Sequence, residues 1–342
     1  MERNRLIQLD YLRGLMALAV MVFHYDKWTT GTWNADTPQG KLGVYAVSSF
    51  FIISGMTLAH RYAGTLPRAW KSFATRRVQR IFPMLWLATI ATLVIDDHPR
   101  SWQTILLNLS GLFGFADASA DIATGAWSIG CELVYYCFFP LLLWTGERKK
   151  WIFLLLWMAA AACGLARAFF PPFSVSGTSQ TVWWPYYVQA PGQAWFFITG
   201  AGLSLFSQNL KVIPEKYWKW LMLAGMSVFL LMPTGGDPLS LVAGSGMVIL
   251  SVSTVMAVTG WIFGTGKLPG ILDRVLAWLG DISYALYLLH PLVYRGVKAI
   301  GSRIFDAPLW LWALTAAVVS FAVAHLAEKK AARSVITRPG DQ

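Results

Sequence analysis

The chain has 342 residues, of which 56% are hydrophobic and 13% are charged, and it contains 18 tryptophans. No soluble globular core of this size is so apolar throughout. The net charge of +11 does not indicate nucleic acid binding, because its Lys and Arg residues lie in short segments beside apolar runs. We therefore predict an all-α polytopic membrane protein, embedded in a lipid bilayer, that forms a single domain over 1–342.

About ten apolar runs are close to the roughly 20 residues that a helix needs to cross a bilayer. With a cytoplasmic N-terminus, 20 Lys and Arg residues fall in internal segments and 7 in external ones. This bias predicts that both termini are cytoplasmic. The predicted spans lie near 9–28, 42–60, 76–95, 127–145, 150–170, 188–207, 217–232, 239–263, 278–294 and 308–327.

The segment 101–116 is too short and too polar for a further span, since Asn108, Ser110 and Gly111 interrupt it. A crossing here would also reverse the charge bias of every later loop. We expect a short re-entrant or interfacial segment on the external face.

Three other features complete the organisation of the chain. The N-terminal run lacks a small-residue cleavage site, which predicts an uncleaved signal anchor. The three cysteines lie in or beside apolar segments and are expected to be free thiols. The aromatic end of the connection 171–187 fits either an interfacial belt or a surface on which a sugar stacks.

The first span carries Asp10, Arg13 and His24 among apolar residues. Eleven residues at about 100° each place His24 within about 20° of Arg13 around the helix and about 16 Å further along it. Ionisable groups inside a bilayer are costly and usually mark a functional cavity. The alternative is a structural hydrogen bond between helices.

Two further ionisable residues, Glu132 and His290, are predicted to lie at the same external depth as His24. Ser283, Tyr287 and His290 follow one helical stripe, and a proline comes directly after the histidine. A His and a Glu in one enclosed site would form a general base and its orienting partner. Each of them alone could instead be structural.

A second cluster is predicted on the cytoplasmic side, at the start of the third span. Arginine forks suit bidentate contact with phosphate, although membrane topology and lipid phosphates also explain such a cluster. Arg13 on the same side favours a polyphosphate ligand, unless Asp10 simply neutralises it. No His or Cys spacing predicts a metal site. The cluster comprises Arg68, Lys71, Arg76, Arg77 and Arg80.

Taken together, these motifs resemble the membrane acyltransferase-3 family of O-acyltransferases. The matching pieces run in the family's order over most of the chain: LDYLRG with the Arg13 and His24 pair, SSFFIISG at 48–55, RRVQRIFP at 76–83, WSIGCELVYYCFFP at 127–140 and ISYALYLLHP at 282–291. One departure is Leu133, where the more common motif has a second acidic residue after Glu132.

The resemblance implies ten core helices and transfer of an acyl group, usually acetyl, from cytoplasmic acetyl-CoA to an external hydroxyl. The acceptor would be a glycan such as an exopolysaccharide, an O-antigen or a lipid-linked saccharide, and the location a bacterial inner membrane. It implies that His24 is catalytic, supported by Glu132 and Arg13. Arg13 with Arg76, Arg77 and Arg80 would bind the acyl-CoA donor. The residues expected near the substrate or around the site are Asp10, Asp26, Ser54, Trp127, Ser128, Tyr287 and His290.

Two other functions stay open at this point. A proton-coupled exporter or flippase of glycans or lipids could use His24, Glu132 and His290 as a proton relay. A component that only relays the acyl group would lack its own acceptor site. Because no hydrolase-like domain follows before Gln342, direct transfer or a separate external partner protein is expected.

Overall fold

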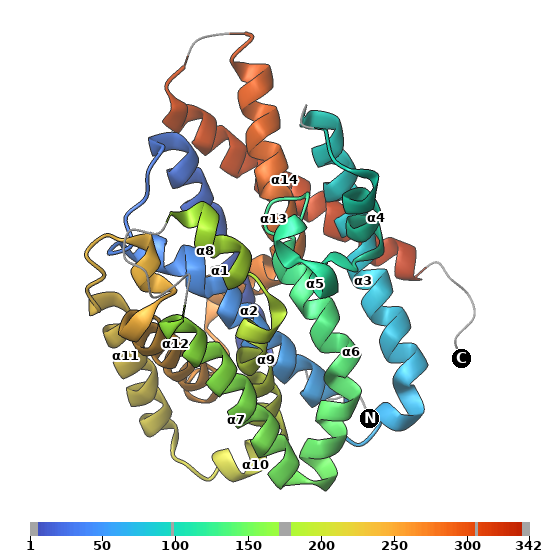
Figure 1. Ribbon diagram of the computed structural model, residues 1–342, viewed down its shortest axis with the longest axis vertical. Coiled ribbons are helices and arrows are strands. Elements are labelled where there is room, and N and C mark those ends of the chain that lie inside the picture. Colours follow the sequence, from blue (N-terminus) through green and yellow to red (C-terminus); the bar gives the residue numbers. More distant parts are fainter. Residues whose placement is uncertain (1–5, 97–98, 171–178, 305–306, 337–342) are drawn as a thin grey trace.

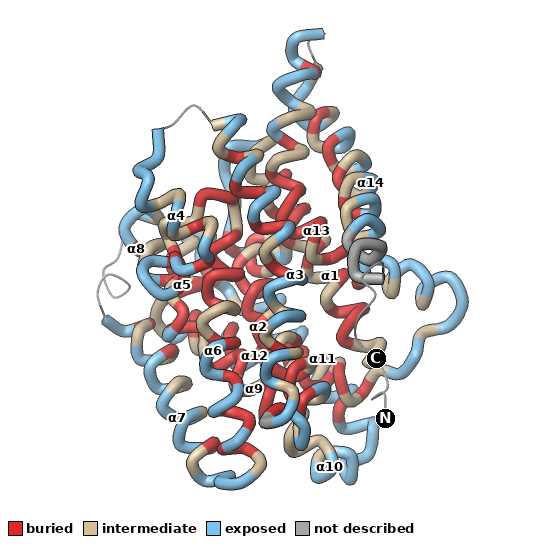
Figure 2. Tube along the Cα trace, turned by 90° about the vertical axis from the view of Figure 1, so that its right-hand side faces the viewer, coloured by how far each residue is buried: buried red, intermediate tan, exposed pale blue. Residues whose placement is uncertain are grey.

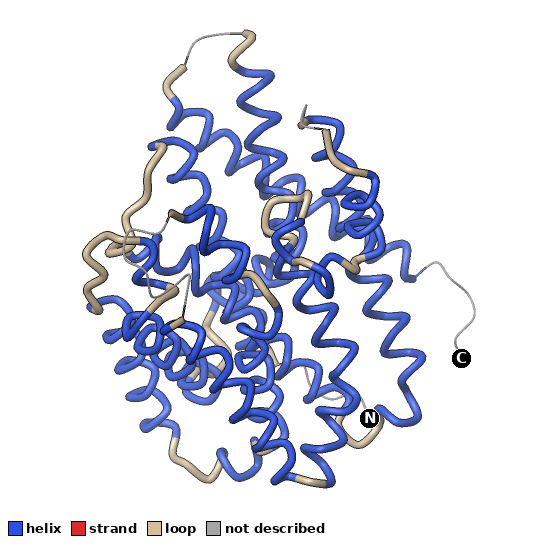
Figure 3. The backbone as a smooth tube through the Cα atoms, in the orientation of Figure 1, coloured by secondary structure: helices blue, strands red, loops and turns tan. Residues whose placement is uncertain are grey.

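The computed structural model describes residues 6–96, 99–170, 179–304 and 307–336, and within these ranges every regular element is a helix (Figure 3). The prediction of an all-α membrane protein is confirmed. The longer helices are α1 (Ile7–Thr30), α2 (Pro38–Tyr62), α3 (Leu66–Ile95), α6 (Trp127–Arg148), α7 (Lys150–Ala166), α9 (Ala190–Leu205), α11 (Glu215–Leu231), α12 (Gly244–Gly264), α13 (Gly270–Gly301) and α14 (Leu309–Ile336). The short ones are α4 (Trp102–Ser110), α5 (Phe113–Ala116), η1 (Ala118–Ala120), η2 (Arg167–Phe169), α8 (Gln180–Tyr187), α10 (Ser207–Leu210) and η3 (Pro238–Leu241).

Helices lie at all ten predicted spans. Eight of them are long and apolar enough to cross a membrane by length and composition, whereas α9 and α11 have only 16 and 17 residues. In Figure 1 the α6–α7 turn, α10 and the α2–α3 turn gather at one end of the molecule, and the end of α13 lies at the other end. This arrangement agrees with the predicted grouping of these connections by side.

Burial also fits a bilayer protein. Buried residues concentrate along the middle of the helix bundle, and exposed ones follow its outer surface (Figure 2). Many exposed side chains are large and apolar, including Val94 and Leu231 at 79% exposure and Val318 at 71%. Such a surface would promote aggregation in water but suits contact with lipid.

The segment that contains α4 and α5 does not cross the bundle. The nine residues of α4 extend only about 14 Å, less than half of the hydrocarbon thickness. The buried Asn108 side chain organises the segment, because its amide donates to the carbonyl groups of Thr104 and Ala120 and its oxygen accepts from the Ile122 amide. Backbone polar groups are thereby satisfied within the protein, as a re-entrant segment requires.

The two helices that carry the histidines, α1 and α13, pack side by side and run parallel. They approach most closely at Gly14 and Gly280, where a Cβ atom on Gly14 would lie 2.7 Å from the Gly280 nitrogen. Small residues at a crossing let two backbones approach in this way. Ten residues further along each helix, the rings of His24 and His290 meet. The glycine contact therefore sets the register of the two helices.

We predict that Gly280→Ala lowers the apparent melting temperature of the protein in detergent by several degrees, because the new Cβ would overlap the Asp10 carbonyl oxygen. Gly296→Ala is the matched control on the same helix, since a Cβ there meets no atom within 4 Å. Without a clash, the higher helix propensity of alanine over glycine would make either substitution stabilising by about 1 kcal/mol. A Gly280→Ala protein as stable as the control would contradict this role for the contact.

Candidate active site

Two histidines from distant parts of the chain form a hydrogen-bonded pair. His24 Nδ1 lies 2.8 Å from His290 Nε2, and the two rings stack with their planes 18° apart. The other nitrogen of His290, Nδ1, lies 2.9 Å from the Leu286 carbonyl oxygen one turn earlier in α13. A chain of hydrogen bonds thus runs from His24 through His290 to the backbone of α13.

This chain of contacts fixes the protonation sites of the two neutral rings. A carbonyl oxygen can only accept, so His290 Nδ1 must carry the hydrogen that Leu286 receives. His290 Nε2 is then an acceptor, and His24 Nδ1 must donate to it. His24 Nε2 is consequently left without a hydrogen. That nitrogen has the lone pair that a general base or a nucleophile needs.

Aromatic and hydroxyl groups hold the pair in place. Trp28 stacks on the His24 ring at 5.0 Å between centroids. The Tyr25 hydroxyl donates to the His290 carbonyl oxygen and lies 2.8 Å from the Ser320 hydroxyl of α14. Three helices, α1, α13 and α14, therefore determine where the histidines lie.

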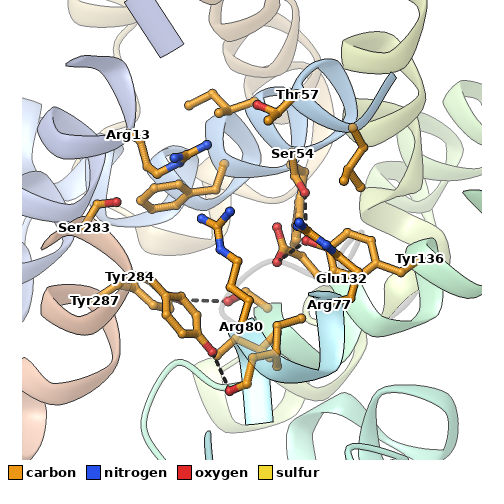
Figure 4. A pocket seen from close by; sticks show the side chains of 17 residues that line it. Arg13, Ser54, Thr57, Arg77, Arg80, Glu132, Tyr136, Ser283, Tyr284 and Tyr287 are labelled. Carbon is orange, nitrogen blue, oxygen red and sulfur yellow. Dashed lines mark hydrogen bonds between the residues drawn. The ribbon is translucent and has the colours of Figure 1, made fainter. Parts of the chain in front are cut away.

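A separate cavity of about 80 Å³, which we call the arginine cavity, lies towards the start of α1. Figure 4 shows three guanidinium groups directed into this space, from Arg13 of α1 and from Arg77 and Arg80 of α3. Glu132 of α6 faces them and accepts a hydrogen bond from Tyr136, which also contacts the Ser54 hydroxyl. The lining thus combines three cations with one carboxylate.

Two buried polar atoms of this cavity have no hydrogen-bond partner within the described residues, namely Arg77 Nε and Thr57 Oγ1. Buried polar groups are nearly always satisfied. The Arg13 guanidinium is partly neutralised, since Asp10 lies 3.3 Å away. The remaining positive charge and the two unsatisfied atoms favour an anionic ligand.

The arginine cavity is closed where it approaches His290. The Tyr287 hydroxyl lies 2.9 Å from both the Ser128 hydroxyl and the Gly125 carbonyl oxygen. Gly125 has a φ of 86°, a left-handed conformation that glycine adopts readily. Arg80 also lines the cavity and is exposed. Neither His24 nor His290 lines this cavity, and Tyr287 is the lining residue that precedes His290 in α13.

Comparisons with known proteins identify the family. The sequence profile of a family described as an acyltransferase domain matches residues 6–328. The chain belongs to the membrane acyltransferase-3 family. This confirms the resemblance drawn from the motifs.

Several curated proteins are similar to this acyltransferase-family chain. A Staphylococcus aureus (strain COL) protein provisionally named O-acetyltransferase is 24% identical, over 82% of this chain and 49% of its own length. Nodulation protein 10 of Rhizobium leguminosarum bv. viciae is 25% identical, over 89% and 86% of the two chains. Acyltransferase MdmB of Streptomyces mycarofaciens is 27% identical, over 94% and 87%. The chain spans about half the length of the Staphylococcus relatives, and no solved structure matches it.

Within this family member, the predicted site residues divide between the two places. His24 and His290 form the pair, whereas the arginine cavity is lined by Arg13, Ser54, Arg77, Arg80, Ser128, Glu132 and Tyr287. Asp10 supports the cavity through Arg13.

Three predicted residues lie outside both places. Arg76 is exposed, bonds to the Ser72 hydroxyl and does not line the cavity. Trp127 is buried against Phe51, Trp184 and Tyr187. Asp26 lies near the far end of α1 and lines neither the cavity nor the histidine pair.

The predicted partnership of His24 with Glu132 is replaced by the contact of His24 with His290. Glu132 bonds to Tyr136 in the arginine cavity instead. Sequence reasoning also missed Tyr136 and Thr57 in the cavity and the carbonyl of Leu286. A signal for Tyr136 was present, because it follows Glu132 by four residues and so shares its helix face.

We predict that magnetic resonance of the protein with isotope-labelled histidine rings shows His24 protonated at Nδ1 and bare at Nε2. His290→Phe should remove this preference, because the acceptor for Nδ1 is lost. His325→Phe is the control, since His325 contacts Trp278 on another part of the surface. A His24 tautomer that does not respond to His290→Phe would contradict the assignment.

Proposed function

We propose that this protein is a membrane O-acyltransferase that moves an acetyl group from acetyl-CoA to a hydroxyl of a glycan. The observation that carries the proposal is the chain of contacts from His24 through His290 to the Leu286 carbonyl, from which we infer a bare His24 Nε2, in a chain of the acyltransferase-3 family. A hydroxyl becomes an effective nucleophile when a base takes its proton in the transition state.

The arginine cavity is the proposed site for the acidic part of the donor. Guanidinium groups bind phosphates through paired hydrogen bonds, and three of them converge here. The separation of Arg13 and His24, about 16 Å along α1, is comparable with an extended pantetheine arm. The thioester would thereby reach His24 while the nucleotide stays on the cytoplasmic side.

The size of the cavity implies that the helices move when the donor binds. A volume of about 80 Å³ is well below the roughly 300–1,000 Å³ of typical ligand sites. The hydrogen bonds of Tyr287 to Ser128 and Gly125 stand between the cavity and the histidines. Passage of the acyl arm would break them.

The proposed transfer balances without a further reactant. His24 Nε2 takes the proton of the acceptor hydroxyl as that oxygen attacks the thioester carbonyl carbon. The new C–O bond forms, and the C–S bond breaks when the tetrahedral intermediate collapses. The imidazolium then returns its proton to the sulfur, and CoA leaves as the thiol. His290 supports this role because it holds the His24 ring with Nε2 free.

A covalent variant uses the same nitrogen. His24 Nε2 would attack the thioester itself, release CoA and carry the acetyl group until the hydroxyl accepts it. Acetylated His24 trapped after donor is added without acceptor would select this variant. Transfer without any trapped species would select direct attack.

The structure offers less support for an exporter or flippase with a His24, Glu132 and His290 relay. A relay needs its groups joined by hydrogen bonds, and Glu132 bonds to Tyr136 rather than to either histidine. An acyl-relay component that hands the acetyl group to an external partner shares the donor half of the proposed chemistry.

The experiment that tests the function is CoA thiol release from acetyl-CoA by the protein in lipid nanodiscs, with and without crude bacterial glycans. We expect glycan-stimulated release that falls at least about a hundredfold in His24→Ala, the loss typical of a general base. His325→Ala is the matched control and should retain the activity. The absence of both CoA release and acetyl-CoA binding would count against an acyltransferase and favour a transporter.

A second prediction concerns the donor site. Arg80→Gln should weaken acetyl-CoA binding about tenfold or more, because it removes a charge-assisted contact with phosphate. Arg76→Gln removes the same charge from the same helix outside the cavity and should change the dissociation constant less than about twofold. Equal effects of both substitutions, measured by calorimetry, would show that only general surface charge matters.

A further inference from the structure

A second and larger cavity lies at the far end of α1. It has a volume of about 780 Å³ and is formed by the last turns of α1 and α3 and the second half of α13. Three cations and two aromatic rings dominate its lining: Lys27, Trp28, Tyr294, Arg295 and Lys298. Apolar contact is provided by Ile95 and Ala299.

This cavity adjoins the histidine pair. Trp28 lines it and stacks on the His24 ring with an interplanar angle of 16°. Tyr294 lies 5.1 Å from Trp28 between ring centroids and completes the wall. Arg13 and Lys27 are 14 residues apart, which places the two cavities about 21 Å apart along α1. His24 lies between them and closer to the second cavity.

The positive charge of the second cavity is only partly explained by the fold, because Lys27 contacts the Trp33 ring and Lys27 and Lys298 lie in the last turns of α1 and α13, where a cation is favoured. None of its described lining residues is acidic, and no ion pair joins its three cations to a described carboxylate. The cavity also lies at the end of the molecule that is predicted to be external. The positive-inside rule disfavours Lys and Arg there, so topology does not account for Arg295 and Lys298.

We propose that this cavity binds the acceptor, and that the acceptor is a saccharide with a phosphate or carboxylate group. The anionic group would lie against Lys27, Arg295 and Lys298, and a sugar ring would pack on Trp28 and Tyr294. The acceptor hydroxyl would then face His24 from the side opposite to the donor. This inference rests on the proposed acyltransferase function and adds the class of acceptor.

The test is calorimetric binding of three probes to the protein in neutral phosphatidylcholine nanodiscs: N-acetylglucosamine, its 1-phosphate and glucuronate. We expect an acidic sugar to bind at least about tenfold more tightly than the neutral one, with the difference reduced by salt. The phosphate and carboxylate probes show which oxyanion the site prefers. Equal affinity for all three probes would overturn the proposal.

Matched variants test whether the affinity for acidic sugars comes from this cavity. The double variant Arg295→Gln/Lys298→Gln should remove at least about tenfold of the acidic-sugar affinity. Arg303→Gln, nearby but outside the lining, should change it less than about twofold. An equal loss in the control would overturn the site. So would complete displacement of the probes by phosphatidylglycerol in the nanodisc, since the cations would then serve a lipid headgroup.

This binding measurement is independent of catalysis. Loss of probe selectivity alongside intact glycan-stimulated CoA release would overturn only the acceptor class. Selective probe binding by a protein that releases no CoA would overturn the acyltransferase function and leave an anionic-saccharide site.

Discussion

The close contact between Gly14 and Gly280 determines the geometry on which the rest of the site depends. Because α1 and α13 run parallel and touch at these glycines, equal steps along both helices keep their side chains level. Ten residues beyond the contact, His24 meets His290. Close to it, Arg13 faces the cavity that Ser283 and Tyr284 also line. The crossing of α1 and α13 thus positions both Arg13 and His24 of α1.

The arrangement along α1 suggests why one helix carries both Arg13 and His24. The cavity proposed for the donor lies near the start of α1, and the cavity proposed for the acceptor lies near its end. The proposed reaction would take place between them, at His24. Neither CoA nor the glycan would need to cross the membrane, since only the acyl group has to reach the histidine.

Much of the fold follows from apolar periodicity and charge bias. All ten predicted spans coincide with helices, and the interrupted segment 101–116 forms the short α4 and α5. The alignment of Arg13 with His24 also follows from the sequence, because 11 residues complete slightly more than three turns of one helix. These features are local or depend on one periodicity, so a single sequence specifies them.

Which side chains of different helices contact one another could not be predicted in the same way. Depth estimates placed Glu132 level with His24, but they assumed that α6 begins at the membrane surface. Figure 1 shows α5 and the start of α6 near the middle of the long axis. Glu132 lines the same cavity as the arginines instead of meeting His24. Arg76 is one residue from Arg77, and the step of about 100° turns it out of the cavity.

The central claim is that His24 and His290 act as one unit, and a double-mutant cycle on glycan-dependent acetyl transfer tests it most directly. Rates would be compared for the native protein, His24→Ala, His290→Leu and the double variant. The account predicts that His290→Leu slows the native protein by about tenfold or more but has no further effect once His24 is absent. Independent effects that multiply in the double variant would contradict the account.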